Sequence, residues 1–216
     1  MHKTIIFDMD GTLIDTEKYY RKYWPMALQA FGYEMTDDQA LSMRSLGRPF
    51  AVERMKEWYG ADLDYWAVRE KRKELMEAEL QEKGIELRPG CRELLTWLRA
   101  HGFRTAIATA TDEQRTKDYL QRIGLQDSFS EVISATMVKQ GKPAPDIYLY
   151  ACEKLGEKPG DVYAVEDAPN GILSASRAGC RVIMVPDQTP SDEELRMRIW
   201  REVPTLSDII GLLETS

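Results

Sequence analysis

Short apolar stretches alternate with amphipathic helical stretches over most of this chain. Five stretches rich in Ile, Val and Ala are bounded by polar or turn residues, and we expect them to form buried parallel strands at 4–7, 104–109, 131–134, 162–165 and 181–185. Segments with helical periodicity lie between them and are each followed within two residues by a glycine: 92–100, 112–122, 145–154 and 170–178. This alternation predicts an α/β fold built on a doubly wound parallel sheet.

The alternation is interrupted once, after the first strand. No strand-like run occurs between residues 16 and 87, where four helical segments fit: 18–31, 37–44, 50–59 and 64–83. Residues 87–90 contain a proline and a glycine and are expected to form the return connection. We therefore predict two domains, an α/β core of residues 1–15 and 88–216 and an inserted α-helical domain of residues 16–87. The charged stretch 69–83 is interpreted as a solvated helix face.

Composition narrows the classes of partner and compartment. The 216 residues carry a formal net charge of −7, which argues against nucleic acid and anionic membranes because both select basic patches. The longest apolar run, 147–152, is far below the ~18 residues of a membrane-spanning helix. We expect no cleavable signal sequence, because strand-like residues begin at Thr4. Three widely spaced cysteines favour a reducing cytoplasm. The default expectation for the oligomeric state is a monomer.

Composition also limits the chemistry available. The chain has two histidines, His2 and His101, and no CxxC, GxGxxG or GxSxG motif. A serine–histidine relay or a histidine-based zinc site is therefore not expected. Any catalysis has to come mainly from carboxylates, lysines and hydroxyls.

Two pairs of acidic residues follow predicted strands. Asp8 and Asp10 follow the first strand, and Glu166 and Asp167 follow the strand at 162–165. Taken alone, each pair is also typical of a polar turn or a helix start. Because ligands bind beyond the carboxyl ends of parallel strands, the four carboxyl groups converge if these two strands are neighbours. Such a cluster of oxygen ligands suits Mg²⁺ together with a phosphate.

Two further positions offer groups that bind phosphate. Thr109 and Ala110 lie where a strand runs into a helix N-terminus, and Lys142 precedes a proline-rich turn. Considered alone, Thr109 would be interpreted as an ordinary threonine at a strand end, and Lys142 as a surface lysine. Their order relative to the two acidic pairs favours a phosphate site.

The motifs DMDGT, ATAT, GKPAPD and VEDAPNG, in this order and with a helical insert after the first, carry a family resemblance. The chain resembles the haloacid dehalogenase-like hydrolase superfamily, and within it the branch of β-phosphoglucomutase and small sugar-phosphate phosphatases. The resemblance spans essentially the whole chain. It implies a Rossmann-like core with an α-helical cap. Ala168 departs from the serine that is frequent at this position in the family.

The resemblance implies a role for each motif residue. Asp8 is the nucleophile that forms an aspartyl-phosphate, and Asp10 is the general acid for the leaving oxygen and then the base for water. The transferring phosphoryl group is held by Thr109, Ala110 and Lys142. The implied cofactor is Mg²⁺, with a ligand set drawn from Asp8, the Asp10 backbone carbonyl, Glu166 and Asp167.

The function expected from this resemblance is Mg²⁺-dependent hydrolysis of a small phosphorylated metabolite, in particular a sugar phosphate. A phosphosugar mutase of the β-phosphoglucomutase type is the main alternative, and a catalytically silent binding or regulatory module is another. The mutase resemblance implies a histidine and an arginine at positions that fall here at Tyr20 and near Phe50. Tyrosine in place of the histidine, and phenylalanine near the place of the arginine, favour hydrolysis over the mutase reaction. Tyr20 and Arg48 are the candidate specificity residues.

Overall fold

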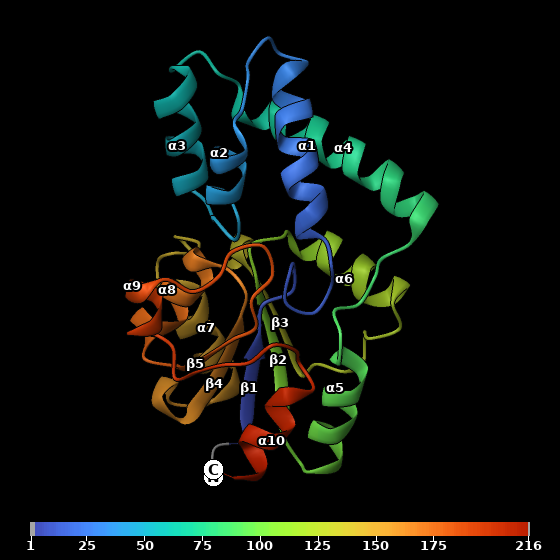
Figure 1. The fold of residues 1–216 in the computed structure, drawn as a ribbon, viewed down its shortest axis with the longest axis vertical. Helices are drawn as coiled ribbons and strands as arrows, with labels where there is room; N and C mark the ends of the chain where they lie inside the picture. Colours follow the sequence, from blue (N-terminus) through green and yellow to red (C-terminus); the bar gives the residue numbers. More distant parts are fainter. Residues whose placement is uncertain (1–2, 216) are drawn as a thin grey trace.

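A six-stranded parallel sheet forms the centre of the larger part of the molecule (Figure 1). The computed structural model describes residues 3–215, so His2 lies outside the described part. The strand order is β3-β2-β1-β4-β5-β6. The strands are β1 (Thr4–Phe7), β2 (Arg104–Thr109), β3 (Glu131–Ser134), β4 (Val162–Glu166), β5 (Arg181–Met184) and β6 (Arg201–Glu202). All five predicted strands are present, and β6 is an addition at the sheet edge.

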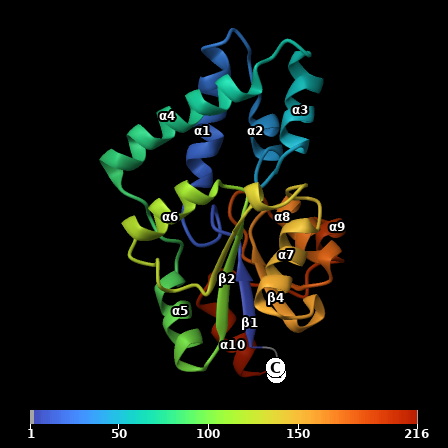
Figure 2. The ribbon, with the colours of Figure 1, turned by 180° about the vertical axis from the view of Figure 1, so that it is seen from behind.

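Helices cover both faces of the sheet, as the two opposite views show (Figures 1 and 2). One face carries α5 (Cys91–Ala100), α6 (Glu113–Arg122) and α10 (Asp208–Glu214), and the other carries α7 (Asp146–Leu155), α8 (Pro169–Ala178) and α9 (Glu193–Arg196). Two 3₁₀ turns complete this part, η1 (Ala135–Met137) and η2 (Pro159–Asp161). Side chains alternate across β1, so Ile5 and Phe7 join one apolar cluster while Ile6 joins the other. The predicted doubly wound α/β fold is confirmed.

Four helices follow β1 and lie beyond the carboxyl ends of the strands (Figure 1). They are α1 (Glu17–Gln29), α2 (Asp37–Ser42), α3 (Phe50–Tyr59) and α4 (Tyr65–Lys83), and we call them the helical unit. Trp24, Leu28, Met55 and Val68 belong to an apolar cluster within this unit. No helix within residues 3–215 has both the length and the apolar character needed to cross a bilayer.

The two connections between the helical unit and the sheet run side by side. The Asp15 amide donates to the Glu86 carbonyl at 2.9 Å, and the Arg88 amide donates to the Leu13 carbonyl at 2.9 Å. The chain therefore leaves and re-enters the sheet part at one place. The helical unit is thus covalently joined to the sheet part through one pair of adjacent segments.

Candidate active site

The register of the sheet brings the acidic strand ends together. Phe7 of β1 pairs with Ile107 of β2 on one side and with Val165 of β4 on the other. The chain order reverses at β1, which makes this edge the switch point where ligands bind in open α/β sheets. Asp8 and Glu166 therefore lie next to each other at the carboxyl end of the sheet.

Lys142 bridges these two carboxylates. Its Nζ donates to Asp8 Oδ1 at 2.5 Å and to Glu166 Oε1 at 2.7 Å, and the residue is fully buried. Burial opposes the lysine charge, but Asp8 and Glu166 outweigh it and raise the pKa of Lys142 above its usual value. Burial raises the pKa of Asp8 to about 8, and Lys142 counteracts this rise. Tyr148, which no sequence motif indicated, donates to Glu166 Oε1 at 2.5 Å.

Asp10 lies between two hydroxyl groups. Thr16 Oγ1 donates to Asp10 Oδ1 at 2.6 Å, and Thr111 Oγ1 donates to Asp10 Oδ2 at 2.7 Å. The Tyr20 hydroxyl lies 3.1 Å from Thr111 Oγ1, so Tyr20 is part of the same network. Burial raises the pKa of Tyr20 to about 12. The carboxyl group of Asp10 is thus held in place by two hydroxyl donors.

Asp167 is held by one residue from each part of the molecule. Thr12 Oγ1 donates to Asp167 Oδ1 at 3.0 Å, and the Arg44 guanidinium of the helical unit pairs with Asp167 Oδ2. Arg44 also lies 3.6 Å from Glu17 Oε2 and 3.5 Å from Asp187 Oδ2. Burial raises the pKa of Asp167 to about 7, against the effect of Arg44. Sequence reasoning pointed to Arg48 and missed Arg44.

The buried carboxylates fit a divalent cation. Ligand oxygens of Asp8, Glu166 and Asp167 lie within 4.8 Å of one another. Asp8 Oδ2 and Glu166 Oε2 are buried and have no hydrogen-bond partner among residues 3–215. Gly171 makes room for this arrangement, because a Cβ there would lie 1.9 Å from Glu166 Oε2. Hard oxygen donors with unused lone pairs are typical of Mg²⁺ sites.

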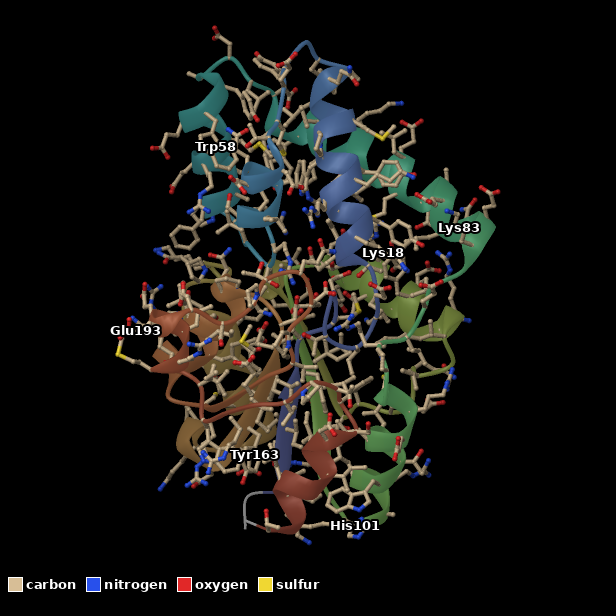
Figure 3. The ribbon with its side chains drawn as sticks, viewed as in Figure 1. Lys18, Trp58, Lys83, His101, Tyr163 and Glu193 are labelled. Atoms are coloured by element: carbon tan, nitrogen blue, oxygen red, sulfur yellow. The ribbon has the colours of Figure 1, made fainter. Side chains whose placement is uncertain are left out.

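The remaining predicted residues border the same region. Thr109 is fully buried and its hydroxyl accepts from the Thr111 amide at 3.1 Å. Ala110 and Arg48 line a cavity between the helical unit and the strand ends. His101 stacks on Trp97 at the end of the molecule away from the helical unit, so it plays no part here (Figure 3).

A family model for haloacid dehalogenase-like hydrolases matches residues 2–179. The chain belongs to this family. It is 30% identical to the phosphorylated carbohydrates phosphatase of Thermotoga maritima, over 98% of this chain and 90% of that protein. It is 26% identical to the β-phosphoglucomutase of Bacillus subtilis, over 87% of this chain and 85% of that protein.

Comparison with solved structures supports the same family. A crystal structure of a mutant of CbbY from Rhodobacter sphaeroides in complex with xylulose-(1,5)bisphosphate aligns with a TM-score of 0.82 and 27% identity, over 96% of each chain. The resemblance predicted from the four motifs is therefore confirmed, as is the hydrolase class.

Proposed function

We propose that this chain is a Mg²⁺-dependent phosphatase that hydrolyses a small sugar phosphate through an aspartyl-phosphate on Asp8. The observation that carries the proposal is the placement of Asp8, whose Oδ1 is held by Lys142 at 2.5 Å while its buried Oδ2 has no hydrogen-bond partner among residues 3–215. The relative from Thermotoga maritima, named a phosphatase of phosphorylated carbohydrates, supports the substrate class.

In the proposed first step, an Asp8 carboxylate oxygen attacks phosphorus while the bond to the leaving oxygen breaks. Asp10 gives the leaving oxygen its proton. In the second step Asp10 takes a proton from water, whose oxygen attacks phosphorus and releases the Asp8 carboxylate. Dividing the reaction in this way lets each half be assisted separately.

Charge neutralisation is the main task in this reaction, because a carboxylate has to approach an anionic phosphate. Lys142 lies against Asp8 and would hold the transferring phosphoryl oxygens together with Thr109 and the backbone at Ala110. A positioned donor of this kind contributes about 3–4 kcal/mol. Asp8, Glu166, Asp167 and the Asp10 backbone carbonyl would hold Mg²⁺, which when bound supplies further positive charge at the phosphate.

The proposal assigns the role of a mobile cap to residues 16–87, over a core of residues 1–15 and 88–216. The paired connections near Asp15 and Arg88 support a hinge, and the cavity lies between cap and core. A closed cap would keep bulk water away from the first step. The proposal also includes a cytoplasmic monomer, in keeping with buried free thiols at Cys91, Cys152 and Cys180.

A mutase is the second candidate, because the relatives include a β-phosphoglucomutase. A catalytically silent module would have no need of the complete set of Asp8, Asp10, Lys142 and Asp167 at the carboxyl end of the sheet.

A screen of phosphorylated metabolites for released phosphate tests the proposal, with Mg²⁺ and with excess chelator. We expect release that requires Mg²⁺ and is strongest for sugar phosphates or related small esters. The absence of release from the whole panel would refute the phosphatase. Full activity in excess chelator would refute the metal requirement.

A further inference from the structure

The cavity between the helical unit and the strand ends is unusually rich in arginine. Its volume, including the opening to solvent, is about 660 Å³. The sheet part contributes Asp10, Ala110 and Thr111 to its lining. The helical unit contributes four arginines: Arg44, Arg48, Arg69 and Arg72.

Arg72 differs from the arginines that already have carboxylate partners. Arg44 pairs with Asp167, and Arg69 lies 3.5 Å from Asp112. The Arg72 side chain is 5% exposed, and among residues 3–215 it has neither a carboxylate at ion-pair distance nor an acceptor for its buried Nε. Buried charges are normally paired, so an unpaired arginine in a cavity calls for an anion.

Aromatic rings fix the position of Arg72. Its guanidinium carbon lies 4.5 Å from the ring centroids of both Tyr20 and Trp24. Contacts with ring faces hold the planar group without using its N–H donors. Burial lowers the pKa of Arg72 from its usual value, and the charges of Arg115 and Arg69 add to this effect. An anionic group of the substrate would compensate the positive charge of Arg72.

The network around Tyr20 shows which end of a substrate reaches Arg72. Arg72 stacks on Tyr20, the Tyr20 hydroxyl lies 3.1 Å from Thr111 Oγ1, and Thr111 donates to Asp10. Asp10 is the proposed acid for the leaving oxygen, whereas the transferred phosphoryl group belongs with Lys142. Arg72 therefore lies on the leaving-group side of the site.

We propose that Arg72 binds a second anionic group, a carboxylate or a phosphate, at the end of the substrate remote from the transferred phosphoryl group. This inference rests on the proposed phosphatase function and narrows its substrate class to monoesters charged at both ends. The fork of a guanidinium fits carboxylate and phosphate oxygens equally well, through two parallel hydrogen bonds.

Two matched substrate pairs test the inference on the unaltered protein. The first pair is 2-phosphoglycolate and 2-hydroxyethyl phosphate, and the second is fructose 1,6-bisphosphate and fructose 1-phosphate; both belong in the metabolite panel. We expect kcat/KM to be roughly 10- to 100-fold higher for the charged member of at least one pair. The pair in which the charged member is preferred shows whether Arg72 binds a carboxylate or a phosphate. No preference in either pair, with phosphate released from other panel members, would overturn the inference but keep the phosphatase. No release from the whole panel would overturn both.

The variant Arg72→Gln tests the residue, with Lys73→Gln as the matched control. Lys73 carries the same charge one position along α4 but is paired with Glu70 at 3.1 Å. Arg72→Gln should remove the preference for the charged substrate, mainly through KM, by lowering kcat/KM at least roughly tenfold more for the charged member than for the neutral member. Lys73→Gln should keep the preference. An equal loss for both members of a pair would mark Arg72 as merely structural. If Arg72→Gln fails to fold, as judged by circular dichroism, the ratios of kcat/KM measured with the wild-type protein still test whether a second anionic group is preferred.

Discussion

Asp8 and Asp10 are two residues apart, yet their surroundings differ in charge. Asp8 contacts the ammonium group of Lys142, while Asp10 accepts hydrogen bonds from the hydroxyls of Thr16 and Thr111. A cationic neighbour stabilises the carboxylate anion that the proposed attack by Asp8 requires, whereas the two hydroxyls orient the carboxyl group of Asp10. Different surroundings commonly divide two acids into two roles.

The variant Asp8→Asn should lower turnover by at least about 10³-fold, because an amide cannot form the covalent intermediate. Phosphate release with the preferred substrate measures the effect, and circular dichroism checks the fold. Asp127→Asn, the same change at an exposed position, should leave turnover unaltered. Residual activity of Asp8→Asn within tenfold of wild type would exclude Asp8 as the nucleophile.

The variant Asp167→Ala should weaken Mg²⁺ binding by at least roughly tenfold, as measured by titration calorimetry. Asp187→Ala is the matched control, because Asp167 and Asp187 both lie at ion-pair distance from Arg44 and only Asp167 belongs to the proposed ligand set. The control should bind Mg²⁺ nearly as the wild type does. An equal loss of Mg²⁺ affinity in both variants would indicate that Asp167 acts by pairing with Arg44 and is not a metal ligand.

At the residue scale, the sequence predicts the groups that follow strands better than those on the inserted helices. Asp8 and Glu166 could be placed together because parallel strands share one carboxyl edge. Arg44 and Arg72 could not, because their positions depend on how the helices pack against one another and on the sheet. Helical periodicity gives the apolar face of a helix but not its orientation toward a distant strand end.

At the scale of elements, two loops lock the helical unit to the segment that carries Lys142. The Gly47 amide donates to the Lys142 carbonyl at 2.8 Å, and the Gly141 amide donates to the Arg48 carbonyl at 2.7 Å. A Cβ on Gly141 would lie 2.7 Å from the Gly47 Cα. The backbones therefore touch, and the proposed closure of the helical unit would be coupled to the position of Lys142.

The variant Gly141→Ala should hold these loops apart and lower kcat/KM by roughly 10- to 100-fold, because small misplacements of catalytic groups are costly. Gly211→Ala in α10 is the control, since nothing lies within 4 Å of a Cβ there. That change should leave activity intact and stabilise the fold by about 0.5–1 kcal/mol, measured by denaturant unfolding. Wild-type kcat/KM in Gly141→Ala would show that the loop contact is not needed for closure.

Two α-helices and one strand that sequence reasoning missed lie close together near the end of the chain. The pattern beyond residue 185 predicted no element, yet α9, β6 and α10 occur there with four, two and seven residues. α9 and β6 are too short for a helical or strand period to be recognised. The longer helices of the core and of the helical unit showed it clearly, and they are present within a few residues of their predicted bounds.

On the scale of the whole molecule, the groups proposed for chemistry and for selectivity lie mainly in different parts. The sheet part supplies Asp8 and Lys142, whereas the helical unit supplies Arg44 and Arg72. Under the proposed function, a change at Arg72 would alter the choice of substrate, whereas a change at Arg44 would also affect Asp167 of the proposed metal site. Relatives of comparable identity include both a phosphatase and a mutase.

We expect groups from the helical unit to decide between hydrolysis and the mutase reaction. A mutase has to keep water from the aspartyl-phosphate and needs a proton carrier together with a second phosphate clamp. The tyrosine at the expected histidine position, Tyr20, has a pKa raised by burial to about 12, so it remains protonated at neutral pH. Phe50, near the expected arginine position, packs against the apolar cluster of the helical unit. Arg72 could clamp a second anion but cannot carry a proton.

We therefore expect hydrolysis without any requirement for a bisphosphate. The test supplies β-glucose 1-phosphate with a trace of the 1,6-bisphosphate and measures glucose 6-phosphate and free phosphate in parallel. The β-phosphoglucomutase of Bacillus subtilis serves as the positive control for isomerisation. Any turnover of this substrate should yield free phosphate in proportion to the substrate consumed, and the bisphosphate should not accelerate it. Rapid formation of glucose 6-phosphate with little free phosphate would instead establish a mutase, because phosphoryl transfer would then return to sugar faster than water can intercept it.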